Sequence, residues 1–316
     1  MDFIKVIFIR LGSLFLLKPF LKSKIFIFCF HDISEKSALQ FSEHYSTETN
    51  NFLKQIDFIE KNFEIISINK IKDRNTLDKN KRYAIITFDD GFFSVICNAH
   101  PFLKEKNIPY TIFLNQSAIE KNQLWCSNLV INKKNIEYLK SFYNKYFIHK
   151  TEDNYFDFIN NKKLPIENIN YSNLKYDKQD NNDKIYATQK DIKYLIEQNP
   201  LVTIGNHTSN HYNLSKCSFE LQEEEIVNNH NFIKETFGIS AQHFAIPFGK
   251  KSHFSEETIR ILSRNKYPNI YSTNPTYIDL KANNTYAAFP RIGITNQTVS
   301  ELIFYINRTL FKKLDL

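Results

Sequence analysis

The sequence has little of what marks fibrous, disordered or disulfide-built proteins. Its 316 residues include only 6 glycines, 9 prolines and 4 cysteines, and 42% are hydrophobic against 24% charged. These fractions are typical of a globular protein and exclude collagen, a disordered chain and a coiled-coil rod. The length fits one large domain or two ordinary ones, and a core of that size needs no disulfide.

The cysteines and the basic residues exclude further classes. Cys29, Cys97, Cys126 and Cys217 lie far apart with no C-x-x-C pair. They predict neither a disulfide framework nor a zinc ribbon, and indicate reduced thiols in a cytoplasmic protein. The net charge is +7, but lysine and arginine are scattered, which favours a solvated surface over a nucleic-acid partner. Attraction to an anionic membrane or an acidic glycan stays open.

The amino-terminal segment is strongly apolar. Residues 3–20 read FIKVIFIRLGSLFLLKPF, and Lys5, Arg10 and Lys18 interrupt the apolar run. A membrane span needs about 20 apolar residues with few charges, and a secretory signal needs an unbroken apolar centre. We therefore expect an amphipathic helix over residues 1–22, which either contacts a membrane surface through residues 1–20 or packs on the domain.

Short apolar runs then alternate with helical patterns. The runs are continuous, as in strands buried on both faces, and they lie at 24–30, 64–68, 83–88, 110–114, 201–205, 243–248 and 269–272. Helices are predicted around 52–63, at 188–198 with Thr188 as N-cap, and at 218–237 between an N-cap at Ser218 and Gly238. Repeated strand–helix–strand order predicts a parallel α/β fold, either a barrel or a doubly wound sheet.

Residues 115–187 break this alternation. The stretch is polar, and it is rich in Asn, Lys and Asp from about residue 150 to 184. We interpret it as an insertion in a barrel-like domain that spans residues 23–316, with a helix around 132–147. A separate small domain is the alternative, but its core would be thin.

Four of the predicted strands end in polar or turn-forming residues. These residues are His31-Asp32, Asp89-Asp90-Gly91, Asn206-His207 and Pro247-Phe248-Gly249. In a β/α barrel the carboxyl ends of all strands open on one face, where reactive groups collect. This shared placement predicts that the four groups contribute to one site.

Two of these groups have the composition of a metal site. Asp89 and Asp90 cannot both be buried and ionised without a nearby cation or donor. Asp90 could instead cap a helix, which would leave Asp89 unexplained. His207 and His211 are four residues apart, which would place both on one side of a helical turn. With one aspartate they form a His-His-Asp set suited to zinc or another divalent transition metal.

The same residues carry a resemblance to a known family. The sequences TFDDG at 87–91 and HTSNH at 207–211 resemble the first two motifs of the polysaccharide deacetylase family (NodB-homology domain, carbohydrate esterase family 4). The sequence AIPFG at 245–249 resembles the third motif. The resemblance covers roughly residues 24–295 and implies a distorted (β/α)7 barrel of the NodB-homology type, which agrees with the number of predicted strands.

The resemblance also implies roles for the first two motifs. Asp90, His207 and His211 would bind a divalent metal ion, for which Zn²⁺ is favoured while Co²⁺, Ni²⁺ and Fe²⁺ stay open. Asp89 would be the general base that takes a proton from a metal-activated water.

The third motif is implied to face the substrate. Pro247, Phe248 and Gly249 would contact it, and the backbone N–H of Phe248 would stabilise the oxyanion. Trp125, the only tryptophan, could stack on a sugar ring, although ordinary partial burial is the commoner fate of a single tryptophan.

The sequence departs from the family pattern at two places. The third motif usually begins with an arginine that pairs with the catalytic aspartate, and this position is Ala245. Arg291 could supply the cation from a later strand end, or could be a surface residue. The late Leu-x-His element is absent, since no histidine follows His253. His31 resembles an early histidine of a family subgroup, which implies a general acid there; a structural histidine is the alternative.

These expectations predict a metal-dependent deacetylase that removes an N-acetyl group from a carbohydrate, such as a surface polysaccharide or a lipid-linked glycan. A hydrolase of the same fold acting on an O-acetyl, formyl or non-sugar amide group is one alternative. A non-catalytic glycan-binding relative is another, because of Ala245 and the missing late histidine.

Overall fold

The computed structural model describes residues 18–35, 46–124, 184–282 and 284–312. The predicted amino-terminal helix and the helix around 132–147 therefore lie outside the described residues, apart from a 3-10 turn at Lys18–Leu21. No helix in the described part of the chain is long and apolar enough to cross a membrane.

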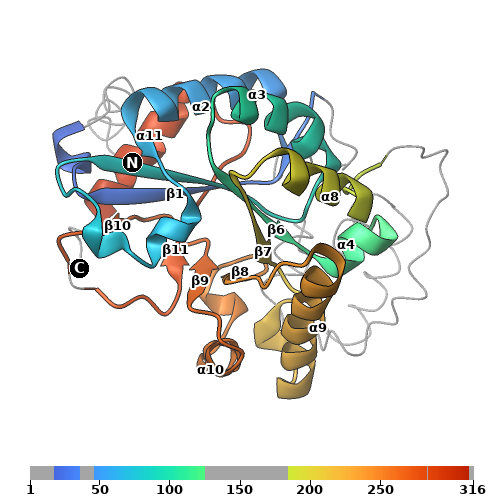
Figure 1. Ribbon diagram of the computed structural model, residues 1–316. Coiled ribbons are helices and arrows are strands. Elements are labelled where there is room, and N and C mark those ends of the chain that lie inside the picture. The colour runs from blue at the N-terminus through green and yellow to red at the C-terminus, as the bar shows by residue number, and fades with distance from the viewer. Residues whose placement is uncertain (1–17, 36–45, 125–183, 283, 313–316) are drawn as a thin grey trace, which may run out of the picture.

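Six parallel strands form most of a barrel-like sheet (Figure 1). In spatial order they are β1 (Lys24–Phe30), β5 (Arg82–Phe88), β6 (Tyr110–Leu114), β7 (Val202–Asn206), β8 (His243–Ala245) and β9 (Asn269–Ser272). Each pairs in parallel with the next, so their carboxyl ends lie at the same edge of the sheet.

A short segment near the carboxyl terminus closes this barrel. Strand β11 (Phe289–Pro290) pairs in parallel with β9, and β12 (Ile292–Gly293) pairs in parallel with β1. The segment 289–293 therefore bridges the first and last strands and supplies a seventh strand position, as the (β/α)7 prediction requires. Arg291 is the residue between β11 and β12.

The remaining strands are short additions to this frame. Strand β10 (Ile278–Asp279) pairs antiparallel with the amino end of β1, and β4 (Glu64–Ile65) pairs with β5. Strands β2 (Asp32–Ile33) and β3 (Ser46–Thr47) form a separate two-stranded sheet just beyond the carboxyl end of β1.

Helices cover the outside of the sheet (Figure 1). They are α2 (Thr49–Asn62), α3 (His100–Glu105), α4 (Gln116–Lys121), α8 (Gln189–Gln198), α9 (Phe219–Phe237), α10 (Glu256–Arg264) and α11 (Val299–Lys312). A π-helical turn at Val95–Ala99 leads directly into α3. Helix α4 and Tyr186, which is buried, lie at the two ends of the predicted insertion and pack on the barrel.

The observed element ends show which local signals were reliable. Thr188 and Ser218 cap α8 and α9, and Gly238 ends α9 in the left-handed conformation, as predicted. The strand expected over 64–68 is wrong beyond Ile65, because a 3-10 turn begins at Ile68. The strand expected over 243–248 ends at Ala245, since Phe248 adopts a left-handed φ of 59° that no strand accommodates.

Alternation along the strands divides the core into two layers. In β1, the even-numbered residues Phe26, Phe28 and Phe30 belong to the large cluster between sheet and helices. The odd-numbered Ile25 and Ile27 belong to a smaller cluster inside the barrel. Successive side chains of a strand point to opposite faces, so the odd-numbered residues that follow continue along the inner face.

Candidate metal centre and active site

The inner face of the barrel ends in reactive side chains. On β1 the inward series Ile25 and Ile27 continues with Cys29, and His31 follows one residue past the end of the strand. On β5 the inward series leads to Asp89, the first residue after the strand. Cys29 is fully buried and Asp89 is 2% exposed. Every second residue of these strands points into the barrel. The first of these residues are apolar and form the core, and the last are a thiol, an imidazole and a carboxylate at the carboxyl ends of adjacent strands.

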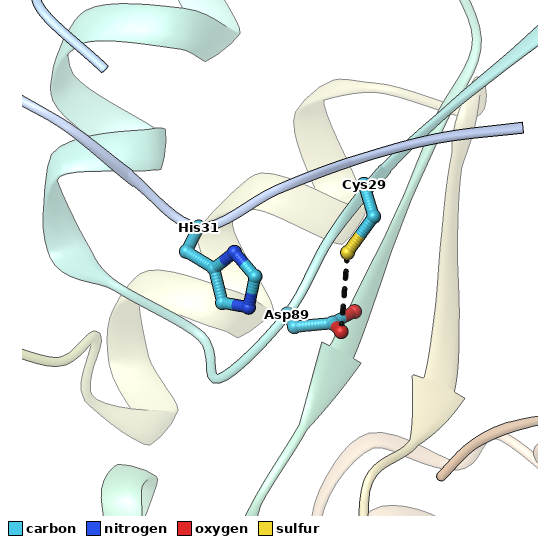
Figure 2. A group of neighbouring side chains, drawn as sticks. All are labelled: Cys29, His31 and Asp89. Atoms are coloured by element: carbon cyan, nitrogen blue, oxygen red, sulfur yellow. Dashed lines mark hydrogen bonds between the residues drawn. The ribbon is translucent and has the colours of Figure 1, made fainter. Parts of the chain in front are cut away.

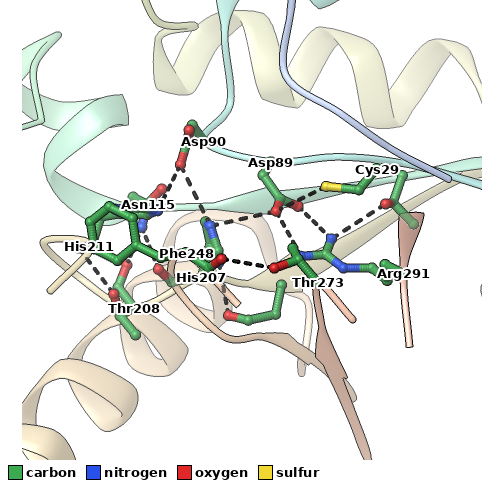
Figure 3. Close-up of polar contacts among 12 residues, drawn as sticks. Cys29, Asp89, Asp90, Asn115, His207, Thr208, His211, Phe248, Thr273 and Arg291 are labelled. Carbon is green, nitrogen blue, oxygen red and sulfur yellow. Dashed lines mark hydrogen bonds and ion pairs between the residues drawn. The ribbon is translucent and has the colours of Figure 1, made fainter. Parts of the chain in front are cut away.

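Three predicted metal ligands converge beside this group (Figure 3). Asp90 Oδ1 lies 3.6 Å from Nε2 of His207 and 3.5 Å from Nε2 of His211. One ligand atom from each of the three residues lies within 4.8 Å of the others, and all three side chains are buried. A single divalent cation could contact all three atoms after small adjustments.

The hydrogen bonds of these residues fit a metal ion. His207 Nδ1 lies 2.8 Å from the carbonyl oxygen of Ala245. Since a carbonyl only accepts, Nδ1 carries the proton and Nε2 presents its lone pair, as in metal-binding histidines. Asp90 Oδ1 is buried and accepts no hydrogen bond from the residues that the structure describes, a costly arrangement unless a cation is bound.

The protonation states point the same way. Burial lowers the pKa of His207 to about 4, although Asp89 opposes this, and burial together with His207 lowers the pKa of His211. Both imidazoles are therefore neutral near pH 7, which metal binding requires. Burial and then the charge of Asp89 raise the pKa of Asp90. A bound cation would reverse that shift, because an opposite charge stabilises the carboxylate.

The loop that carries both histidines is not helical, so the helical-turn interpretation of their spacing is wrong. Residues 207–213 form an irregular bend in which Thr208 and His211 have φ values of 67° and 60°. The backbone N–H of His211 donates to Thr208 Oγ1. Such left-handed conformations cost free energy in non-glycine residues and cluster at functional sites.

The buried Glu225 of α9 holds this loop. Its two carboxylate oxygens accept hydrogen bonds from the backbone N–H and the side-chain amide of Asn210, at 2.8 and 2.6 Å. Its backbone carbonyl accepts from the N–H of Ser209 at 3.0 Å. This support was not predicted from the sequence, although a glutamate on the buried side of a predicted helix was a usable signal.

Asp90 does not cap a helix either. Its φ is 71°, and the following Gly91 has a φ of 74°. An N-cap residue normally has β-region dihedrals. The tight left-handed turn at Asp90 and Gly91 instead lets two consecutive aspartates serve different partners, Asp90 the histidines and Asp89 an arginine.

Arg291 forms a buried, two-pronged ion pair with Asp89 (Figure 3). Its Nη1 lies 2.7 Å from Oδ1 and its Nη2 lies 2.8 Å from Oδ2. Arg291 is fully buried, which contradicts the alternative of a surface residue. Ala245, where the family usually has arginine, packs in the barrel core. The guanidinium therefore reaches Asp89 from the segment that closes the barrel.

The guanidinium determines the charge of Asp89. Burial alone would raise the pKa of this carboxyl group, but Arg291, and then His207, hold it far below its usual range. Burial lowers the pKa of Arg291, but Asp89 more than offsets this, so that the pKa of Arg291 is raised. Asp89 is thus ionised and Arg291 charged at every physiological pH.

Cys29 and His31 lie next to Asp89 (Figure 2). The thiol of Cys29 donates to Asp89 Oδ2 with a sulfur–oxygen distance of 3.3 Å. Ligand atoms of Cys29, His31 and Asp89 all lie within 4.8 Å of one another. Burial lowers the pKa of His31, and Asp89 partly opposes this. The contact of Cys29 was not predicted from the sequence, although its spacing of two from His31 in an extended segment indicated a shared face.

The third motif forms a tight turn over the histidines. Gly249 N–H donates to the carbonyl of Pro247 at 2.7 Å, with Phe248 between them. The ring of Phe248 lies edge-on to His211 with centroids 4.5 Å apart. Thr273 Oγ1 donates to the carbonyl of Phe248 at 2.8 Å. Pro247, Phe248 and Gly249 therefore lie beside the metal-ligand set. Trp125 lies outside the described residues.

The fold and this set of side chains define a barrel protein with a candidate metal site at the carboxyl ends of its strands. The sequence model of the family named polysaccharide deacetylase matches residues 76–270, more than half of the chain. The chain belongs to this family, whose members are hydrolases acting on carbon–nitrogen bonds other than peptide bonds. No curated protein matches the sequence.

Solved structures support the fold. The chain is similar to the deacetylase PplD of Streptococcus pyogenes in complex with acetate, with 16% identity, a TM-score of 0.60, and coverage of 90% of this chain and 99% of that one. It is also similar to IcaB from Ammonifex degensii, with 15% identity, a TM-score of 0.61, and coverage of 90% of this chain and 97% of that one. A de-N-acetylase from Aggregatibacter actinomycetemcomitans is similar as well, with 14% identity, a TM-score of 0.58, and coverage of 89% of this chain and 99% of that one.

Proposed function

We propose that this protein is a metal-dependent deacetylase that hydrolyses an N-acetyl group on a carbohydrate. The observation that carries the proposal is the adjacency of two differently charged units. Asp90, His207 and His211 converge as a neutral-imidazole and carboxylate ligand set, and the ionised Asp89 lies 3.7 Å from His207 Nε2 through its Oδ2. A cation site with a carboxylate base beside it suits hydrolysis of an amide.

Asp90, His207 and His211 would hold the metal ion, with Zn²⁺ favoured by the two nitrogen ligands and one oxygen ligand. When bound, the ion supplies Lewis-acid polarisation of the acyl oxygen and lowers the pKa of water. Asp89 accepts the proton of the attacking water, and Arg291 keeps the carboxylate ionised and fixed in orientation through its two hydrogen bonds.

We assign protonation of the departing amine to His31. Its imidazole lies close to Asp89, so it can receive the proton that Asp89 takes from the attacking water and pass that proton to the departing amine. The backbone N–H of Phe248 is our candidate for an oxyanion donor, because the turn at 247–249 lies against the ring of His211.

The decisive experiment measures acetate release from N-acetylated sugars by the metal-saturated protein. Asp89→Asn should abolish release while the metal content stays unchanged. The control is Asp279→Asn, which changes a carboxylate of β10 that pairs with Lys24 at the amino end of β1 and should keep wild-type activity. Removal of the metal by a chelator should abolish release, and added metal should restore it.

The same panel separates the alternatives. Release of formate, or of acetate only from O-acetyl esters or non-sugar amides, would change the substrate assignment but keep the mechanism. Sugar binding in calorimetry without any release from the metal-saturated protein would refute catalysis and leave a glycan-binding protein. Release by Asp89→Asn at the wild-type rate would refute the base assignment.

We further propose that the protein is cytoplasmic and that its residues 1–20 contact a membrane surface. The exposed Lys18 and Lys22 flank Phe20 in the sequence, and Phe20 is 65% exposed. Basic residues beside an exposed aromatic suit an anionic lipid surface. Flotation with anionic but not neutral liposomes, lost when residues 1–22 are removed, is the expected result; no flotation would refute membrane contact.

A further inference from the structure

Cys29 is a buried, titratable group to which the mechanism above gives no role. It is fully buried at the carboxyl end of β1, where its backbone pairs with Thr87 of β5 on one side and Gly293 of β12 on the other. Asp89 directly follows β5, and Arg291 directly precedes β12. The thiol is therefore placed where the two halves of the ion pair meet.

The thiol completes the set of donors around one oxygen of Asp89. Each carboxylate oxygen can accept about two hydrogen bonds. Oδ2 accepts one from Arg291 Nη2 at 2.8 Å and one from Cys29 Sγ at 3.3 Å. Among the described residues, Oδ1 accepts from Arg291 Nη1 alone. The two oxygens of the proposed base are thus held unequally.

We propose that Cys29 is a positioning residue for Asp89, and that its protonated thiol restrains the motion of the carboxylate that the two hydrogen bonds from Arg291 leave free. The inference rests on the proposed function of Asp89 as the base. Arg291 fixes the plane of the carboxylate through two parallel hydrogen bonds, but a guanidinium–carboxylate pair can still rock as one body. A third donor from a different strand prevents this motion.

The environment keeps the thiol in the donating form. Burial raises the pKa of Cys29; Arg291 opposes this, while Asp89 adds to it, and the pKa stays well above its ordinary value. A protonated thiol next to a carboxylate can only donate to it. The second acceptor within reach, the Phe30 carbonyl at 3.9 Å, is too distant to compete strongly.

A second metal ion is not the better explanation of this cluster. Cys29, His31 and Asp89 have the spacing of a metal-ligand set, but both oxygens of Asp89 are bound to Arg291. A cation there would have to displace or approach a buried guanidinium of the same sign, and would have to remove the proton from a thiol whose pKa is raised.

The test separates the hydrogen bond from packing. Cys29→Ser keeps a donor in a slightly smaller side chain, whereas Cys29→Val replaces the donor by a somewhat larger apolar side chain that suits a strand. We expect Cys29→Val to lower kcat by roughly fivefold to tenfold, the effect of one moderate hydrogen bond, with KM and metal content unchanged. Cys29→Ser should recover most of the wild-type kcat. Cys97→Ala, which removes an exposed cysteine, is the control.

The outcomes distinguish this inference from the proposed function. If the wild type releases acetate and Cys29→Val is equally fast, or if Cys29→Ser is as slow as Cys29→Val, the positioning role is refuted. If the wild type releases nothing, the proposed function fails instead.

An infrared measurement tests the hydrogen bond between Cys29 and Asp89 even if the protein shows no activity. The S–H stretching band that Cys29→Ser removes should move to higher wavenumber in Asp89→Asn, because an amide oxygen accepts more weakly than a carboxylate. A band that stays in place would refute the hydrogen bond.

Discussion

Replacing Arg291 by glutamine should destabilise the protein strongly. Arg291 and Asp89 are 0% and 2% exposed and share two hydrogen bonds of 2.7 and 2.8 Å. Removing one member of such a pair leaves a buried charge without compensation, which typically costs about 3–5 kcal/mol. We therefore expect Arg291→Gln to lower the free energy of unfolding by roughly this amount in urea titrations of the metal-saturated protein.

A surface pair provides the matched control. Arg264 also contacts a carboxylate, that of Glu223, but its side chain is 59% exposed. Exposed ion pairs contribute about 0–1 kcal/mol, so Arg264→Gln should have little effect. In addition, the double variant Asp89→Asn/Arg291→Gln should be more stable than Arg291→Gln alone, because it contains no bare carboxylate. Equal losses for Arg291→Gln and Arg264→Gln, or strictly additive losses in the double variant, would refute the reasoning.

The difference in the free energy of unfolding between the wild type and Arg291→Gln should change with pH in a definite direction. In the wild type the pKa of Asp89 is lowered, so the stabilisation is present above the unfolded-state pKa of about 3.9 and is lost as pH falls through the folded-state pKa. In Arg291→Gln, burial without the guanidinium should raise the folded-state pKa of Asp89. The variant should then regain stability as the carboxylate becomes protonated. The gap between wild type and variant should therefore narrow toward acid pH, and a constant gap would contradict this.

Three further changes test the site and its frame. His207→Ala should lose the metal in elemental analysis, whereas His243→Ala, which removes an imidazole bonded to Tyr271, should retain it; a metal-bound His207→Ala would refute the ligand assignment. Gly249→Ala should cost about 1–3 kcal/mol, because its φ is 69° and a Cβ would lie 2.6 Å from a neighbouring backbone nitrogen, whereas Gly293→Ala meets nothing within 4 Å; equal melting temperatures would contradict this. Ser218→Ala should lose about 0.5–2 kcal/mol with the N-cap of α9, and an unchanged unfolding midpoint would speak against that cap.

Sequence patterns predicted the elements whose signals are local. The run at 24–30 is β1 from its first residue to its last, and Ser218 and Gly238 bound α9 as expected. Both depend on side chains that act within a few residues, namely apolar continuity, an N-cap hydroxyl and a glycine with positive φ. The convergence of Asp90 with His207 was also predictable, because parallel strands end at one edge.

Features that depend on contacts between distant strands were not predictable in the same way. The sequence indicated Arg291 as a replacement for the arginine missing at Ala245, but not that residues 289–293 close the barrel between β9 and β1. The spacing of His207 and His211 predicted a helical turn, whereas the chain bends through two left-handed residues held by Glu225. A helix and a bend both satisfy a spacing of four, and only tertiary contacts decide between them.

The barrel closure has a consequence for how such proteins are classified. A search that scores the letters of one motif would find alanine where it requires a cation and would discard the chain as inactive. The positive charge nevertheless reaches the same carboxylate from Arg291, in the segment between β11 and β12 far along the polypeptide. Chemical competence in barrels of this kind belongs to a location in space, and different stretches of chain are able to supply it.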